Sequence, residues 1–199
     1  FGERGGVYII DLEKTVVKLQ EALNFVSDIV SRGGIILFVG TKKQGAEVIK
    51  AAALDAGMPY VDRRWLGGTL TNFHTIQNVI KRYLDLRLKL GQGELAKYTK
   101  KEQLGFQKEM EDLEIKVGGL VGLNKLPQAI FILDIKHEET ALTEAVKCHV
   151  PIVAVCDTNV NPEDIEYIIP GNDDAVKSIK MIVGLVAEAI KEGKAKVAK

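Results

Sequence analysis

Short, unbroken hydrophobic runs recur along the chain, and longer segments with a helical spacing of apolar residues separate them. The runs contain four or five consecutive apolar side chains, without the polar and apolar alternation of a half-exposed strand. Such runs are typical of parallel strands that are buried on both faces. With two shorter stretches, the predicted strands occupy residues 7–10, 35–39, 58–61, 129–133, 152–156 and 165–169.

Amphipathic segments between these runs predict helices. Apolar residues recur at spacings of three and four between Leu12 and Val30, directly after Asp11, a residue type favoured as a helix N-cap. The other helices of this set are expected at residues 41–57, 138–148 and 175–190. The segment from Lys191 onward is expected to fray into a tail. Strands that alternate with helices predict an α/β fold, a flavodoxin-like or Rossmann-like parallel sheet with helices on both faces.

Two helical segments with heptad spacing interrupt this alternation. The first is expected at residues 71–90 and includes Arg87 in its otherwise largely apolar seam. After a glycine-containing breaker, Thr99 and Glu102 have the spacing of a capping box, and a second seam runs to Val117. Matching seams on either side of a breaker predict an antiparallel coiled-coil αα-hairpin, about 30 Å long for 20 helical residues.

The domain organisation follows from this insertion. Residues 1–70 and 118–199 are expected to form the α/β core, and residues 71–117 a protruding coiled-coil hairpin. The alternative is that both seams simply pack on the core. Heptad spacing with polar flanks favours the projecting arm.

Composition places the chain among globular proteins and gives no sign of a membrane segment. Hydrophobic residues make up 46% and charged residues 27%, and no apolar run approaches the roughly 20 residues that span a bilayer. The start of the sequence lacks the apolar core of a signal peptide. Cys148 and Cys156 are too few for a disulfide framework and lack metal-ligand spacing, which favours a reducing cytoplasm.

Charge is balanced overall but distributed unevenly. The chain carries 27 basic and 27 acidic residues, so no global excess points to a polyanionic partner. Residues 62–117 hold 11 basic and 8 acidic groups, a net charge of +3, whereas residues 118–199 hold 9 and 12, a net charge of −3. The middle of the chain is therefore where a phosphate-binding surface is expected.

Motifs for catalysis are incomplete. Gly40 and the residues after it begin like a phosphate loop, but Ala46 and Glu47 stand where the motif needs lysine and a hydroxyl residue. Backbone N–H groups of Gly40 and Thr41 can still serve a phosphate at a helix N-terminus. The three histidines lack ligand spacing, and no nucleophile with a base can be assembled. We therefore predict no catalytic residue, no metal site and no cofactor.

The segment from Arg64 to Asn72 has the mixture of residues expected of a contact surface. It contains the only tryptophan, two glycines and several hydrogen-bonding side chains, and Arg63 precedes it. Arginines bind phosphate with two donors and Trp65 can stack on a base. The alternative is that Trp65 anchors the core, which the sequence favours, and that the arginines pair with carboxylates. The candidate binding residues, including basic positions along the arm, are Lys42, Lys43, Arg63, Arg64, Trp65, Thr69, Asn72, Lys81, Arg82, Arg87, Lys89, Lys97, Lys100 and Lys101.

Six segments occur in the order and spacing of one known family. They are residues 10–15, 37–42, 64–72, 126–134, 157–159 and 169–175, with Glu138, Glu144 and residues 150–151 at matching spacing. Through them the chain resembles the bacterial and organellar small-subunit ribosomal protein two family. The family's further N-terminal segment, with a Gly-Val-His-Phe-Gly-type motif, has no counterpart in the sequence, so contacts made there are not carried over.

The resemblance implies a flavodoxin-like core with a coiled-coil hairpin and a structural role without catalysis. Its implied partners are small-subunit rRNA, ribosomal protein one and other small-subunit proteins, with no membrane. The implied location is the ribosome, in the cytoplasm or in an organellar stroma or matrix. Two rival hypotheses stay open: a pure protein-docking scaffold, and an enzyme or sugar-phosphate-binding domain that uses Thr41, Asp134, Asp157 and Asn172 at the strand ends.

Overall fold

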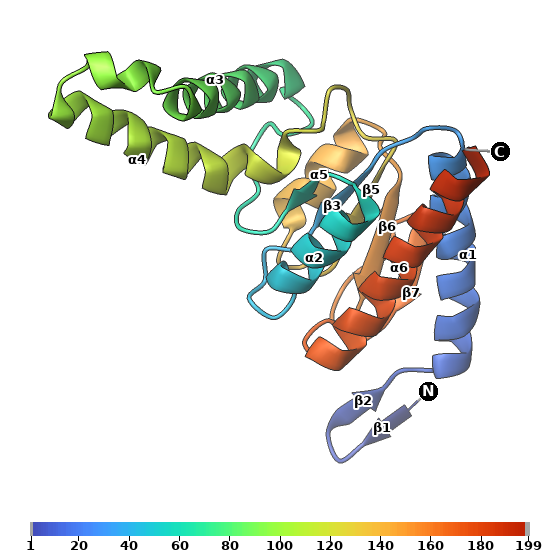
Figure 1. Cartoon of the computed structure of the whole chain (residues 1–199). Coiled ribbons are helices and arrows are strands. Elements are labelled where there is room, and N and C mark those ends of the chain that lie inside the picture. Colours follow the sequence, from blue (N-terminus) through green and yellow to red (C-terminus); the bar gives the residue numbers. More distant parts are fainter. Residues whose placement is uncertain (1, 198–199) are drawn as a thin grey trace.

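A five-stranded, fully parallel sheet forms the centre of the protein (Figure 1). The computed structural model describes residues 2–197. The strands are β3 (Ile36–Val39), β4 (Tyr60–Val61), β5 (Ala129–Ile132), β6 (Ile152–Cys156) and β7 (Tyr167–Pro170). Their order across the sheet is β4-β3-β5-β6-β7, the 2-1-3-4-5 order of flavodoxin-like folds. The predicted α/β class and parallel sheet are confirmed.

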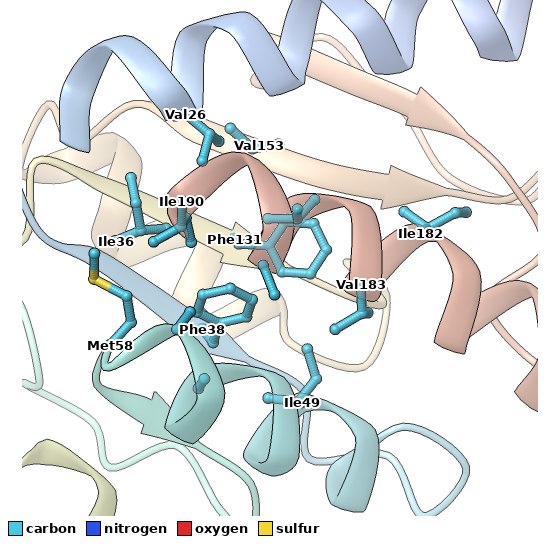
Figure 2. Close-up of a cluster of buried hydrophobic side chains, with 14 of the residues drawn as sticks. Val26, Ile36, Phe38, Ile49, Met58, Phe131, Val153, Ile182, Val183 and Ile190 are labelled. Atoms are coloured by element: carbon cyan, nitrogen blue, oxygen red, sulfur yellow. The ribbon is translucent and has the colours of Figure 1, made fainter. Parts of the chain in front are cut away.

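Helices cover both faces of the sheet because its strands carry apolar side chains on both sides. On one face, Phe38 and Phe131 are fully buried against Ile49, Val183 and Ile190 (Figure 2). The helices of this face are α1 (Leu12–Ser31), α2 (Ala46–Ala56) and α6 (Val176–Val197). The hydrophobic cluster of the other face includes residues of α3 (Phe73–Gly91), α4 (Lys100–Val117) and α5 (Glu139–Lys147).

The N-terminal strand belongs to a separate small sheet. Strands β1 (Gly2–Arg4) and β2 (Val7–Ile9) pair with each other in antiparallel fashion and not with the parallel sheet. The first turns of α1 also differ from expectation, since Leu12 and Val16 are 71% and 66% exposed. The buried residues of α1 begin at Ala22, in the part that packs against α6 (Figure 1).

The C-terminal segment was expected to fray from Lys191, and this expectation is wrong. Helix α6 continues to Val197 and is attached to α2 through two lysines. Lys191 binds Asp55 at 2.7 Å, and the Nζ of Lys194 donates to the carbonyl oxygens of Ala56 and Gly57 at 2.7 and 3.1 Å. Lys194 thereby satisfies carbonyls that the end of α2 leaves without helical donors.

Helices α3 and α4 lie side by side and extend away from the sheet (Figure 1). The guanidinium of Arg82 donates twice to the carboxylate of Glu109, at 2.9 and 3.1 Å, which joins the two helices. The end of the α3 seam departs from the expected pattern: Leu86 is 2% exposed, whereas Arg87 and Leu90 are exposed. An unpaired guanidinium in the seam would be costly to bury, so the chain keeps it in water. The coiled-coil character of the pair stays a prediction.

The capping box at the start of α4 is present as the sequence indicates. Glu102 N–H donates to Thr99 Oγ1, and Thr99 N–H donates to the Glu102 carboxylate at 2.9 Å. We expect Thr99→Ala to destabilise this helix terminus by about 1 kcal/mol, since it removes the cap acceptor. Hydrogen exchange at residues 100–103 should accelerate in T99A and stay unchanged in Thr140→Ala, an exposed threonine of α5. Equal exchange in T99A and the wild type would contradict a capping role.

Candidate nucleic-acid interface

The junction loop, residues 63–72, connects the core to α3 and is held by one carboxylate of α5. Glu144 is 6% exposed and accepts five hydrogen bonds from four loop residues. Its Oε1 accepts from Trp65 Nε1 at 3.1 Å and from Gly68 N–H at 2.7 Å. Its Oε2 accepts from Leu70 N–H at 2.9 Å and from the N–H and hydroxyl of Thr71, both at 3.1 Å. The loop is therefore wrapped around a single anion.

The donors around Glu144 decide its ionisation. Burial is the largest single influence and by itself raises the pKa of the carboxyl. The N–H groups of Leu70, Thr71 and Gly68 and the indole of Trp65 act in the opposite direction, and together they lower the pKa below its ordinary value. Glu144 is therefore a carboxylate at neutral pH, which is the form that accepts all five hydrogen bonds.

Two candidate binding residues of the loop point inward. Trp65 is 8% exposed, with its indole N–H occupied by Glu144, and Thr69 is fully buried, with its hydroxyl donating to the carbonyl of Leu66 at 2.6 Å. Trp65 therefore anchors the core, as the sequence favoured. Neither side chain is available for a base or phosphate on the surface, and both are removed from the candidate contact set.

The two arginines of the loop face solvent. The Arg63 side chain is 60% exposed, with its Nε 3.8 Å from the carboxylate of Asp62. Arg64 is exposed and forms no ion pair with the residues that the structure describes. Asn72, at the N-terminus of α3, is also exposed. A fixed loop thus presents two adjacent guanidinium groups at the root of the α3–α4 pair.

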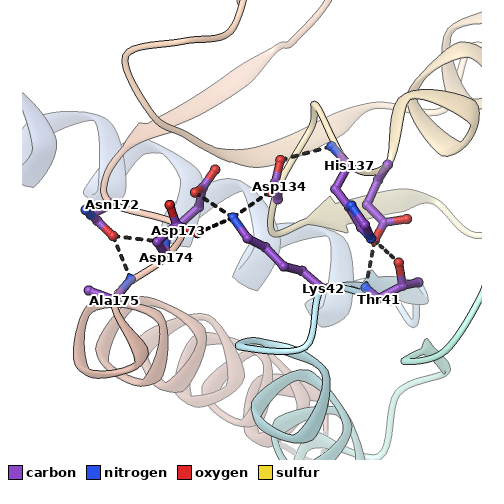
Figure 3. A network of polar contacts seen from close by, with 9 residues as sticks. Thr41, Lys42, Asp134, His137, Asn172, Asp173, Asp174 and Ala175 are labelled. Atoms are coloured by element: carbon purple, nitrogen blue, oxygen red, sulfur yellow. Dashed lines mark hydrogen bonds and ion pairs between the residues drawn. The ribbon is translucent and has the colours of Figure 1, made fainter.

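Lys42 was expected to contact RNA, but its half-buried ammonium is bound by three carboxylates of the protein itself. Its Nζ lies 2.9 Å from Asp134 and 3.2 Å from Asp173, and it also pairs with Asp174 (Figure 3). Burial alone lowers the pKa of Lys42, but hydrogen bonds from its ammonium to the three carboxylates raise it well above its ordinary value. Lys43, the next residue, is exposed and remains a candidate.

The strand ends offer no free phosphate cradle. The N–H and hydroxyl of Thr41 both donate to the Glu138 carboxylate at 2.6 Å, and α2 begins only at Ala46 (Figure 3). The N–H of Gly40 donates to the carbonyl of Val61, so both backbone donors that the sequence left open for a phosphate are occupied, and the helix starts later. Glu138, only 3% exposed, takes the place that a ligand would need.

The other polar residues of this edge hold turns and helix ends. Asp134 accepts from the N–H of His137 at 3.0 Å in addition to binding Lys42. Asn172 accepts from the N–H groups of Asp174 and Ala175, at the start of α6 (Figure 3). Within residues 2–197, no group of three or more His, Cys, Asp or Glu side chains has the arrangement of a metal site. The side chains of Asp134 and Asn172 therefore serve to hold a turn and the start of a helix.

The role of Glu144 was missed by reasoning from charge and motif alone. The signal available in the sequence is its position in α5, because it lies three residues after Ala141 and directly before Ala145, both fully buried. An acidic residue on the apolar stripe of a helix requires hydrogen-bond donors from another part of the chain. The sequence does not indicate that these donors come from a loop more than 70 positions earlier.

The basic residues of α3 and α4 divide into paired and free groups. Arg82 binds Glu109, Lys89 binds Asp85 at 2.8 Å, and Lys97 lies 5.6 Å from the ring centroid of Tyr98. Among the predicted contact residues of the arm, the cations that are exposed and form no ion pair with described residues are Lys81, Arg87, Lys100 and Lys101. Lys108 of α4, which was not among the predicted residues, is also exposed and forms no ion pair with described residues. Together with Arg63 and Arg64, these side chains give the region its available positive charge.

Comparison with known families bears on the hypotheses raised by the sequence. The family model described as Ribosomal protein S2 matches residues 1–193, which include the parallel sheet and both helices of the α3–α4 pair. The chain belongs to the ribosomal protein S2 family. For a member of the S2 family, a structural role in the small ribosomal subunit follows, and proteins of this kind are normally not enzymes. None of the described helices combines the length and apolar character needed to cross a membrane.

Proposed function

We propose that this S2-family chain is held in the small ribosomal subunit by contacts of the junction loop and of α3–α4 with rRNA. Family membership gives the structural role in the subunit, and the exposed arginine pair on a fixed loop is the observation that supports the RNA contact. In this proposal residues 71–117 form a coiled-coil arm inserted between the core segments 1–70 and 118–199. The free cations of the arm extend the contact along the RNA backbone.

The available charge is suited to phosphate recognition. Arg63 and Arg64 can each bind a phosphate with two donors, and the lysines of the arm can add point charges. The six proposed cations of the loop and the arm lie in a segment, residues 62–117, with a net charge of +3, so positive potential is concentrated in one region. The residues proposed to contact RNA are Lys43, Arg63, Arg64, Asn72, Lys81, Arg87, Lys100 and Lys101. Lys97 and the salt-bridged Arg82 and Lys89 contribute less.

Salt dependence of binding to small-subunit rRNA tests this function. The logarithm of the association constant should fall with the logarithm of salt concentration, by about 0.7 to 0.9 per phosphate neutralised. Engagement of most of the six cations therefore predicts a slope of about −4, measured by filter binding with an rRNA transcript. A slope near zero, or absence of binding, would favour the scaffold hypothesis, in which the chain contacts only proteins.

Docking of ribosomal protein one and other small-subunit proteins is the second part of the proposal. Family membership is its support. Purified ribosomal protein one should bind the chain when RNA has been removed by nuclease, as measured by co-sedimentation. Loss of the interaction after nuclease treatment would show that RNA, and not this chain, connects the two proteins.

A further inference from the structure

The five hydrogen bonds to Glu144 are distributed so that they control both ends of the junction loop. The first donor, Trp65, directly follows Arg64, and the last donor, Thr71, lies two residues before α3 begins at Phe73. Between them, Gly68 adopts a φ of 90°, in the left-handed region that favours glycine, and its N–H points at the carboxylate. The Glu144 carboxylate therefore fixes the chain both directly after the arginine pair and directly before α3.

We propose that Glu144 is a positioning residue, which sets the orientation of Arg63, Arg64 and the α3–α4 pair relative to the core so that they reach RNA together. This inference rests on the proposed function of RNA binding, and it assigns to a buried residue of α5 a role at a surface that it does not touch. Pre-organisation of this kind strengthens binding because the loop need not be ordered when the RNA arrives.

Replacement of Glu144 by glutamine separates positioning from packing. The two side chains have nearly the same shape, so the volume of the site is kept. Each carboxylate oxygen of Glu144 accepts from at least two loop donors, whereas an amide has one acceptor oxygen and an NH₂ group. In E144Q the NH₂ group must face N–H donors on one side. The loop therefore has to open there, while the sheet and its core remain filled.

Trp65 provides a local reporter of this change. It is the only tryptophan of the chain, and its indole N–H is bonded to Glu144. Because the pKa of Glu144 is lowered in the folded protein, its stabilising contacts are present above the ordinary carboxyl value and are lost as the pH falls through the lowered value. Trp65 fluorescence should therefore show a transition in acid below about pH 4.5 in the wild type. E144Q should lack that transition.

The orientation of the arm can be measured between two spin labels. Lys101→Cys in α4 and Lys180→Cys in α6 replace exposed lysines, in a background where Cys148 is changed to serine. The native Cys156 is buried, and burial raises its pKa to about 12, which keeps its thiol unreactive toward the label. We expect a narrow distance distribution in the wild-type sequence and a broader one in E144Q. Glu139→Gln, an exposed acid of the same helix, serves as the control and should leave the distribution narrow.

RNA affinity then links orientation to function. E144Q should bind the rRNA transcript about tenfold more weakly than the wild type, an effect typical of residues that act on a site without touching the ligand. Charge reversal of Arg63 and Arg64 should cost less affinity in E144Q than in the wild type, since the arginines are already misplaced. E139Q should bind as the wild type does.

The outcomes distinguish the positioning role from the function on which it rests. If the wild type binds RNA and E144Q binds equally tightly, or if its distance distribution stays narrow, the positioning role is wrong and the RNA interface stands. If the wild type itself fails to bind, the proposed function fails and the positioning role fails with it. Should E144Q not fold, as judged by circular dichroism, Thr71→Val removes one of the five hydrogen bonds. In T71V the distance distribution should then broaden and the RNA affinity should fall, both by less than is expected for E144Q.

Discussion

Reversal of both charges in the variant Arg63→Glu, Arg64→Glu is expected to weaken binding to small-subunit rRNA about 100-fold or more. A hydrogen bond to a charged group contributes about 1.5 to 3 kcal/mol, and two such groups are removed and replaced by anions that phosphate repels. Both side chains are exposed, so the core should be unaffected. Filter binding over a salt series measures the affinity, and the slope should become less negative by about 1 to 2.

A matched control separates this effect from a change in net charge. Lys14→Glu with Lys18→Glu makes the same change of charge on α1, which packs on the opposite face of the sheet from α3 and α5. Both lysines are exposed, and their pairs with Asp11 and Glu21 are surface contacts of little energetic weight. If the control loses as much affinity as the arginine variant, the RNA contact is not located at the junction loop.

Removal of the Lys42 ammonium in Lys42→Met is expected to destabilise the fold by about 3 to 5 kcal/mol. The side chains of Asp134 and Asp173 are 10% and 7% exposed and would be left facing each other without their shared cation. Burial and the neighbouring charge of Asp134 already raise the pKa of Asp173 above its ordinary value. Urea unfolding of K42M and of Lys43→Met compares a half-buried, ion-paired lysine with an exposed one, and K43M should change stability by less than about 0.5 kcal/mol.

Neutralising the carboxylates provides a second check on Lys42. Asp134→Asn with Asp173→Asn in the K42M background should recover part of the lost stability, because the uncompensated buried charge is removed. Stability from Lys42 should also depend on pH in alkali. Since its folded pKa is raised, its contribution is fully present below its ordinary value of 10.5 and is lost as the pH rises through the higher folded value. If K42M is as stable as the wild type, the cluster is not a stabilising element.

The parallel sheet and the capping box could be predicted because their signals are local. Unbroken apolar runs identify strands buried on both faces, and β3, β5 and β6 lie within the expected ranges. Thr99 and Glu102 are three residues apart, so the capping box needs no information from the rest of the chain. The Asp11 N-cap was found for the same reason, as its carboxylate accepts from the N–H groups of Glu13 and Lys14.

The candidate site could be predicted only in part because its decisive contacts join distant parts of the chain. Lysine is usually a surface residue, and nothing near Lys42 in the sequence indicates that its ammonium is ion-paired. Its partners Asp134 and Asp173 are 92 and 131 positions away. Trp65 and Glu144 are separated by 79 positions. The exposure of Leu12 follows from where α1 meets α6, which spacing along one helix does not specify. Residue types locate the region of the interface, whereas tertiary contacts decide which of its cations are free.

Sedimentation of a native lysate on a sucrose gradient tests the central claim most directly. Fractions are probed for the chain at low and at high salt, beside the variant with Arg63 and Arg64 changed to glutamate. The chain should sediment with the small ribosomal subunit at low salt and be released as salt rises, and the arginine variant should be released at a lower concentration. A chain that remains at the top of the gradient at every salt concentration would contradict a structural role in the small subunit.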